Sequence, residues 1–163
     1  MRYAQIRPLD VANGEGIRVS IFVTGCTHAC PECFNEAYQD FKFGQEWTAE
    51  TTAEVIKYLK RPEVTGLTLL GGEPMQNLYL TEVLREVKQH VNKSIWVYSG
   101  YTFEQIMEHP GRRALLEECD VLVDGLFVLA LRNLKLRFRG SSNQRIIDVK
   151  RSLYSGEPCL YME

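Results

Sequence analysis

Residues 17–33 read IRVSIFVTGCTHACPEC, an apolar segment followed directly by closely spaced cysteines. The apolar side chains fall on alternate positions, at Ile17, Val19, Ile21 and Val23, with Phe22 between the last two. This pattern predicts a buried strand that ends at Gly25. Three cysteines follow, with three and then two residues between them: Cys26, Cys30 and Cys33. The spacing offers three thiolates to one metal centre and leaves that centre a coordination position that the protein does not fill.

The cysteine spacing favours an iron–sulfur cluster over the other thiolate sites. Thiolates select zinc, copper(I) or iron–sulfur clusters. A structural zinc site has four ligands, usually as two C-x-x-C pairs, and here a fourth ligand could come only from His28, Cys119 or Cys159. A disulfide framework is disfavoured because three clustered cysteines cannot all pair. A cluster with three protein ligands fits best, and a zinc-binding interaction module is the alternative.

Composition indicates one compact domain that spans residues 1–163. The chain is 45% hydrophobic and carries a formal net charge of −2, so it can bury a core but lacks the basic excess of a nucleic-acid binder. The N-terminus has no apolar core of a signal peptide, and no apolar run approaches the roughly 20 residues of a membrane helix. We therefore expect a cytoplasmic protein with reduced thiols and with neither nucleic-acid nor membrane partners.

Strand and helix patterns alternate along the chain. Strand patterns occur at 17–24, 67–70, 95–98 and 121–123. Helix patterns run from a capping box at 51–54 to Pro62, then over 80–91, 102–107 and 114–119. Such alternation implies parallel strands with functional loops at their carboxyl ends. A closed eight-stranded barrel needs about 250 residues. We therefore expect an α/β fold in the form of an open, partial (β/α) barrel with mainly parallel strands.

A second motif, Gly71-Gly72-Glu73-Pro74, follows the strand predicted at 67–70. It lacks the lysine and hydroxyl of a phosphate-binding loop, and its carboxylate would repel phosphate. Two glycines let the backbone approach a ligand closely, and an acid beside them suits a cation with several N–H donors, such as an amino-acid ammonium. The alternative is a structural turn.

Together, the cysteine triad and the Gly-Gly-Glu-Pro motif resemble the radical S-adenosylmethionine superfamily. Further segments are similar to the family of activating proteins of anaerobic (class III) ribonucleotide reductase. These segments are Asn13-Gly14-Glu15-Gly16, Phe22-Val23-Thr24-Gly25-Cys26, Cys33-Phe34-Asn35, Trp96-Val97-Tyr98-Ser99-Gly100-Tyr101, Val123-Asp124-Gly125 and Arg139-Gly140-Ser141-Ser142-Asn143-Gln144. The resemblance runs from about residue 3 to about residue 150.

The resemblance implies the fold of a radical S-adenosylmethionine enzyme and a role for each motif. Cys26, Cys30 and Cys33 would hold a [4Fe-4S] cluster whose fourth iron binds the cofactor's amino and carboxylate groups. Gly71, Gly72 and Glu73 would contact the cofactor's amino group, and Glu32, Cys33 and Phe34 its adenine. Ser99 would reach the ribose or carboxylate, or else close a turn with Gly100. Asp124 would help organise the methionine end, or else cap a helix or turn.

The implied activity is that of an activating oxidoreductase. A low-potential donor such as a flavodoxin or ferredoxin would reduce the cluster, S-adenosylmethionine would be cleaved, and the resulting radical would take hydrogen from a glycine Cα of the reductase catalytic subunit. An open, partial barrel would admit the glycine loop of that protein. The alternative partner is another glycyl-radical enzyme, whose activases are usually longer and carry extra ferredoxin-like cysteines.

Two further features allow two interpretations each. Residues 132–139 alternate apolar and basic side chains, which predicts either a half-buried edge strand or a basic docking face for the reductase. His28 lies between cluster ligands and could tune the iron, although a solvent-facing loop position is the expected one. His90 and His109 are expected on a helix surface and at a helix end, without chemistry.

Overall fold

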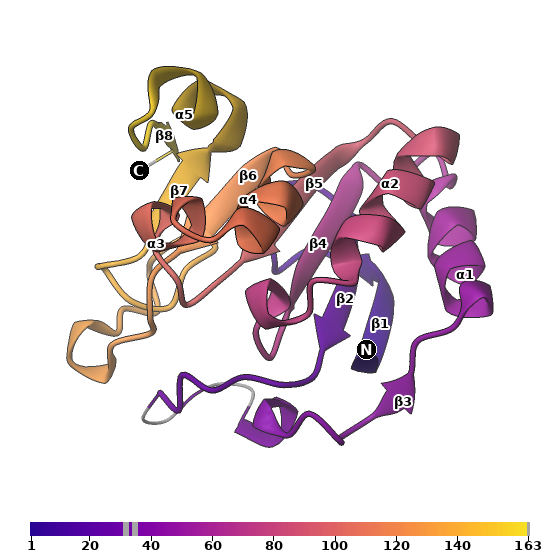
Figure 1. Ribbon diagram of the computed structural model, residues 1–163, viewed down its shortest axis with the longest axis horizontal. Coiled ribbons are helices and arrows are strands. Elements are labelled where there is room, and N and C mark those ends of the chain that lie inside the picture. The colour runs from indigo at the N-terminus through magenta and orange to yellow at the C-terminus, as the bar shows by residue number, and fades with distance from the viewer. Residues whose placement is uncertain (31–32, 34–35, 163) are drawn as a thin grey trace.

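The computed structural model describes residues 1–30, 33 and 36–162. These residues form one open sheet in the strand order β3-β1-β2-β4-β5-β6-β7-β8 (Figure 1). The strands are β1 (Arg2–Asp10), β2 (Arg18–Val23), β3 (Gln45–Glu46), β4 (Gly66–Gly71), β5 (Ser94–Tyr98), β6 (Val121–Asp124), β7 (Arg145–Asp148) and β8 (Leu160–Met162). The sheet does not close on itself, as expected of a chain too short for a full barrel.

The centre of the sheet is parallel and both of its margins are antiparallel. The four predicted strands are β2, β4, β5 and β6, and they pair in parallel. At one margin β1 pairs antiparallel with β2 and β3, and at the other β7 pairs antiparallel with β6 and β8. The expectation of mainly parallel strands was therefore wrong for the whole sheet. It failed because β1 is largely half-exposed, β8 is largely exposed and β7 has only two buried apolar residues, so none of them shows the apolar pattern of a central strand.

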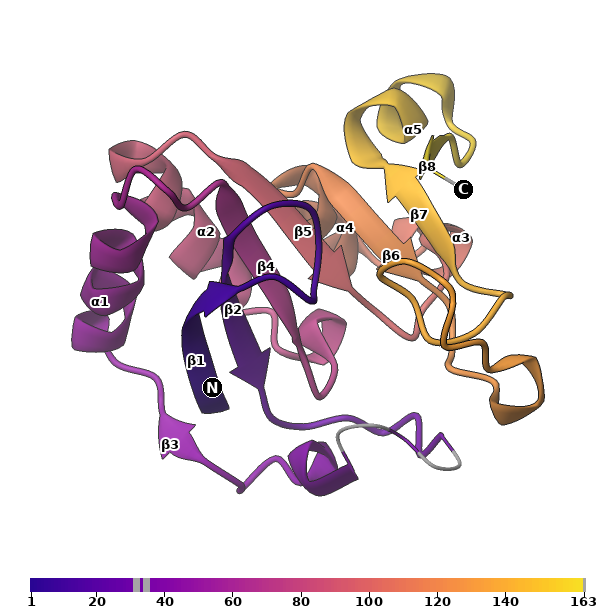
Figure 2. The same ribbon diagram turned by 180° about the vertical axis from the view of Figure 1, so that it is seen from behind.

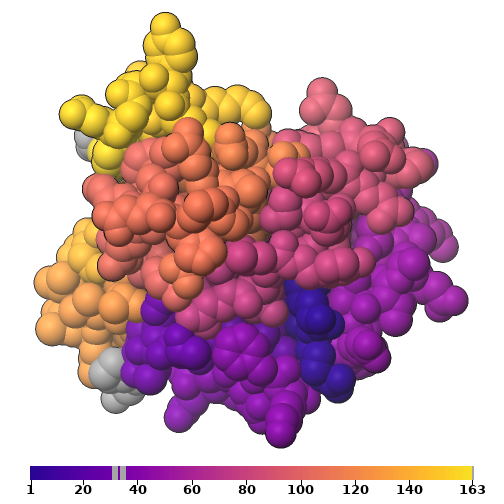
Figure 3. Space-filling model, in the orientation of Figure 1, coloured from indigo at the N-terminus to yellow at the C-terminus, as the bar shows by residue number. Residues whose placement is uncertain are grey.

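Helices cover one face of the sheet. The helices are α1 (Ala49–Leu59), α2 (Leu80–His90), α3 (Phe103–Met107), α4 (Pro110–Glu117) and α5 (Val149–Ser155). Figures 1 and 2 show α1, α2 and α4 on the same side of the central strands, and Figure 3 shows this side as a continuous side-chain surface. Ile21, Leu69 and Val97 point into this helical layer and are fully buried. Their neighbours Phe22 and Leu70 line a cavity on the opposite face, because successive side chains of a strand alternate between faces.

Helix starts follow local capping. Thr102 caps α3, with its hydroxyl accepting from Gln105 N–H at 3.2 Å and its own N–H donating to the Gln105 side chain at 2.9 Å, which confirms the predicted box. In α1 the cap is Thr48 rather than Thr51, because Thr51 occupies the third helical position and accepts from Thr48 N–H at 3.1 Å. In α4 the first residue is Pro110, a favoured start position, so the helix begins four residues before the predicted Ala114.

Arg18 is a buried cation that the sequence pattern did not reveal. It is 1% exposed and lies on β2, and its guanidinium stacks over Trp96. Burial lowers its pKa to about 10. It donates to Thr68 Oγ1 at 2.7 Å and to the carbonyls of Ser94 at 2.8 Å, Leu67 at 2.9 Å and Glu15 at 3.0 Å. Arg18 therefore ties β2, β4, β5 and the loop before β2 together.

Residues 132–139 form a loop, so the predicted edge strand was wrong. Arg132 makes a single isolated bridge with Ser141, and Leu134 is 85% exposed. Phe138 adopts a positive φ of 62° and packs edge-to-face on Trp96, with ring centroids 5.4 Å apart. The apolar side chains of this loop differ in burial, because Leu136 and Phe138 are half-buried at the cavity while Leu134 faces solvent. No helix in the described part of the chain is long and apolar enough to cross a membrane.

Candidate functional site

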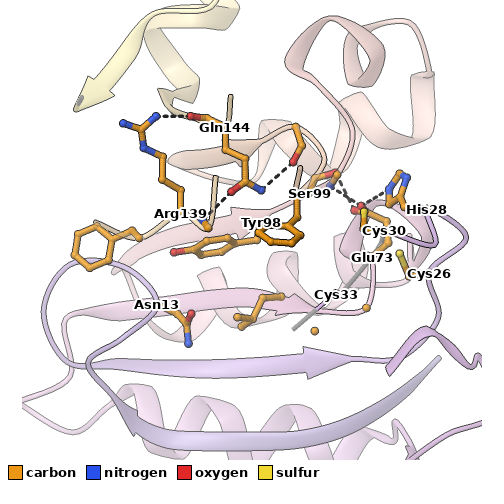
Figure 4. A pocket seen from close by; sticks show the side chains of 18 of the residues that line it. Asn13, Cys26, His28, Cys30, Cys33, Glu73, Tyr98, Ser99, Arg139 and Gln144 are labelled. Atoms are coloured by element: carbon orange, nitrogen blue, oxygen red, sulfur yellow. Dashed lines mark hydrogen bonds and ion pairs between the residues drawn. The ribbon is translucent and has the colours of Figure 1, made fainter. Parts of the chain in front are cut away.

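A cavity of about 650 Å³ lies on the sheet face opposite the helices, at the carboxyl ends of β2, β4 and β5. Its volume falls in the range of about 300–1,000 Å³ typical of small-molecule sites. Seven of the predicted site residues line it: Cys26, Cys30, Cys33, Gly71, Gly72, Glu73 and Ser99. Figure 4 shows the cysteines on one side of this cavity and Asn13, Tyr98 and Arg139 on the other. The structure therefore brings together predicted site residues that are as many as 73 positions apart in the chain, from Cys26 to Ser99.

The cysteine loop is extended and is held by backbone hydrogen bonds. Gly25 N–H donates to Tyr38 O at 2.7 Å, and Cys26 N–H donates to Gln39 O at 3.0 Å. The three thiols are free and half-buried. Burial raises the pKa of Cys26 to about 11, and burial together with the neighbouring Cys33 thiolate raises the pKa of Cys30. Thiols with raised pKa values hold their protons at neutral pH unless a metal centre displaces them.

The donor set fits a cluster better than a single metal ion. Among the described residues, no three His, Cys, Asp or Glu side chains are grouped so that they could hold one ion. Zinc needs its ligands at about 2.0–2.3 Å from one centre. A [4Fe-4S] cluster instead takes one thiolate at each of several irons, so thiols spaced around one cavity are compatible with such a cluster.

Glu73 is the most enclosed acid of the site. Its side chain is 2% exposed, and each carboxylate oxygen accepts two hydrogen bonds. Oε1 accepts from His28 Nε2 and from Gly100 N–H, both at 2.7 Å, while Oε2 accepts from Ser99 Oγ at 2.8 Å and from Met75 N–H at 2.9 Å. The last contact caps the short helix η2 (Pro74–Gln76). Glu73 therefore joins the ends of β4 and β5 to the cysteine loop.

Both glycines of the Gly-Gly-Glu motif are required by close backbone packing. Gly71 has a φ of 112°, and a Cβ there would stand 2.4 Å from Val23 O. A Cβ on Gly72 would stand 2.7 Å from the carbonyl oxygens of both Gly25 and Tyr38. Glu73 N–H donates to Gly25 O at 2.8 Å. The motif therefore lies directly against the start of the cysteine loop.

Asp124 does not line the cysteine cavity. Its carboxylate is 1% exposed, accepts from both Nε and a terminal nitrogen of Arg145, and accepts from Phe103 N–H at 2.8 Å at the start of α3. These contacts match the capping interpretation. Glu32 and Phe34, the expected adenine contacts, lie outside the described residues.

Several residues that line or support the cavity were not identified from the sequence. His28 was expected to face solvent, and this was wrong: its side chain is 13% exposed and bonds Glu73. Gln144 organises the opposite wall, since its side-chain oxygen accepts from Gly140 N–H at 2.8 Å and its amide donates to Gly125 O at 3.0 Å. The available signal was the Gly-Ser-Ser-Asn-Gln run, which had no assigned role.

Comparison with known proteins identifies the family to which this chain belongs. A family model described as "4Fe-4S single cluster domain" matches residues 12–147. The anaerobic ribonucleoside-triphosphate reductase-activating protein of Vibrio cholerae is 38% identical over 90% of this chain and 97% of its own length. Proteins of the same name from phage T4 and Escherichia coli K12 are 37% and 34% identical over 90% and 88% of this chain and 93% and 96% of their own lengths. The chain belongs to this family of activating proteins.

Membership in the activating-protein family confirms the resemblance found in the sequence. The matched range 12–147 contains every residue expected at the site. The family description names one 4Fe-4S cluster, which agrees with the iron–sulfur cluster that the cysteine spacing favoured and the cluster type that the resemblance implied, and gives no support to the zinc-binding alternative.

Proposed function

We propose that this protein activates an anaerobic ribonucleotide reductase by generating a glycyl radical on it with a [4Fe-4S] cluster and S-adenosylmethionine. The observation that carries the proposal is that the three cysteines and the Gly-Gly-Glu motif line one cavity. The names of the relatives supply the partner, and they favour this reductase over other glycyl-radical enzymes.

The bound groups would supply the reaction itself. With one electron from a low-potential donor such as a flavodoxin or ferredoxin, the cluster and S-adenosylmethionine would supply the radical chemistry that removes a hydrogen atom from a glycine Cα of the reductase. Cys26, Cys30 and Cys33 would hold three irons. The Gly-Gly-Glu backbone and the Glu73 carboxylate would position the ammonium end of the cofactor, with Ser99 fixing the carboxylate. Glu32 and Phe34 are proposed to contact the adenine.

The segment 126–139 is proposed as the docking face for the reductase. Several of its apolar side chains are well exposed: Leu126, Val128, Leu129, Leu131 and Leu134. The span 125–147 also contains five basic residues and no Asp or Glu. An apolar patch with one sign of charge is typical of a protein-binding surface and suits an acidic partner surface. The same segment lines the cavity through Leu134, Leu136 and Phe138, so a docked partner would lie beside the reaction centre.

Charge reversal tests the docking face. Lys135→Glu with Arg137→Glu should weaken the complex with the reductase by roughly tenfold, and more at low salt. The matched control is Lys57→Glu with Lys60→Glu, which makes the same charge change at exposed positions in the last turn of α1 and at the residue that follows it. Equal binding by the two double variants would remove the docking assignment and leave the proposed activity intact.

The activity is tested by mixing the anaerobically reconstituted protein, S-adenosylmethionine, a reductant and the reductase. The proposal predicts a glycyl radical doublet in the electron paramagnetic resonance spectrum that requires all four components. A cluster-loaded protein that binds the reductase and yields no doublet would contradict the proposed function.

A further inference from the structure

His28 occupies a defined place between two cluster ligands. Its Nε2 lies 2.7 Å from Glu73 Oε1, although the two residues are 45 positions apart in the chain. The ring also packs edge-to-face on Tyr101, with centroids 4.6 Å apart. Gly100 permits this placement, because a Cβ there would stand 2.7 Å from His28 Cδ2. The imidazole is therefore held by a hydrogen bond and an aromatic contact, and it fits beside residue 100 because glycine has no side chain there.

Glu73 depends on its donors because it is buried. An enclosed carboxylate is stable only when hydrogen bonds satisfy its oxygens. Its other three donors come from η2 and the β5 loop: Met75 N–H, Ser99 Oγ and Gly100 N–H. Within the described part of the chain, His28 is the donor to this carboxylate that comes from the cysteine loop. The contact therefore couples the cluster-binding loop directly to the acid of the Gly-Gly-Glu motif.

A neighbouring contact holds the same loop independently of His28. The Gln76 side chain accepts from Thr27 N–H at 3.0 Å and donates to Thr27 Oγ1 at 2.6 Å. It also donates to the Tyr101 hydroxyl at 2.9 Å. Because this anchor persists without the imidazole, loss of the His28 hydrogen bond should leave the loop attached and able to take up iron.

We propose that His28 is a positioning residue that fixes the Glu73 carboxylate for the ammonium of the bound cofactor. This inference rests on the proposed function. The imidazole N–H and the Gly100 N–H orient Oε1, and the Ser99 hydroxyl and the Met75 N–H orient Oε2. Without the fourth donor the carboxylate can rotate away from the geometry that the cofactor requires.

The test compares two substitutions of this residue. His28→Phe keeps a flat ring against Tyr101 and removes the donor, whereas His28→Gln keeps an N–H donor at similar reach. We expect His28→Phe to weaken S-adenosylmethionine binding to the cluster-loaded protein by about tenfold with iron content near that of the wild type, and His28→Gln to recover most of the affinity. His90→Ala, at the exposed end of α2, should change neither quantity.

A second readout needs no cluster. In the metal-free protein, the amide hydrogens of Met75 and Gly100 are bound to Glu73, so His28→Phe should speed their exchange with solvent while exchange in β4 and β5 stays unchanged. Wild-type affinity and exchange in His28→Phe would overturn the inference, as would weak binding by a folded His28→Gln protein. Failure of the wild type to bind S-adenosylmethionine would instead contradict the proposed function.

Discussion

Gly72→Ala tests whether the two motifs of the site depend on close backbone contact. The new Cβ would lie 2.7 Å from the carbonyl oxygens of Gly25 and Tyr38, closer than real Cβ atoms approach their neighbours. Both oxygens belong to backbone that is already tied, by Gly25 N–H to Tyr38 O at 2.7 Å and by Glu73 N–H to Gly25 O at 2.8 Å. Neither carbonyl can therefore move without straining one of these hydrogen bonds.

The cost of this substitution follows from two effects. Overpacking costs about 1–3 kcal/mol, and a weakened backbone hydrogen bond adds about 1 kcal/mol. We therefore expect Gly72→Ala to lower the free energy of unfolding by about 3 kcal/mol, which lowers Tm by about 6–12 °C for a chain of this size. Thermal unfolding of the metal-free protein measures this loss, and iron content after anaerobic reconstitution should fall as well.

Gly156→Ala is the matched control. Gly156 has a φ of 79° and nothing within 4 Å of an added Cβ, so alanine there adds backbone strain of about 1 kcal/mol without crowding. Iron content of Gly156→Ala should equal that of the wild type. If Gly72→Ala were no less stable than Gly156→Ala and loaded iron fully, the two motifs would not be coupled through their backbones.

Three further predictions concern the cluster, the core and pH. Cys30→Ala should lose the iron of a complete cluster while Cys159→Ser retains it, and full iron in Cys30→Ala would refute the ligand assignment. Arg18→Met should lower the free energy of unfolding, measured with urea, by about 3 kcal/mol, since hydrogen bonds to charged groups contribute about 1.5–3 kcal/mol each. A loss below about 0.5 kcal/mol would contradict the account of Arg18. The hydrogen bond from Arg145 lowers the pKa of Glu104 below its usual 4.5, so this pair stabilises the fold above that pH and loses its effect as pH falls through the lowered pKa. Glu104 is exposed, so Glu104→Gln should lower the free energy of unfolding by less than about 1 kcal/mol at pH 7, and not at all at pH values below the lowered pKa. A difference in stability that does not depend on pH would contradict an origin in this ion pair.

The sequence predicted the parts of the fold in which local pattern and burial agree. The alternation from Val19 to Val23 marks a strand that is buried on both faces, and the apolar stripe over 80–91 marks α2. The sequence did not reveal β1, because its half-exposed side chains give no clear period. Nor did it distinguish the 132–139 loop from an edge strand, since both expose charge at alternate positions.

The site was predicted to the extent that its chemistry lies in short motifs. The cysteine triad lies within eight residues and Gly71-Gly72-Glu73 within three, and both motifs line the cavity. Roles that depend on distant partners were missed. The partner of His28 is 45 positions away, and three of the four acceptors of Arg18 lie 49, 50 and 76 positions away. A single sequence gives no signal for such pairings, because hydrogen bonds across strand ends depend on the register of the finished sheet.

The most direct test of the account is spectroscopic and concerns the fourth iron of the proposed cluster. Electron paramagnetic resonance of the anaerobically reduced protein should show a [4Fe-4S] signal that changes when S-adenosylmethionine is added, because the proposed function requires the cofactor to bind the fourth iron. Chemical analysis should find about four irons per chain. A cluster signal that S-adenosylmethionine leaves unchanged at saturating concentration, or a protein that assembles no such cluster, would contradict the central claim.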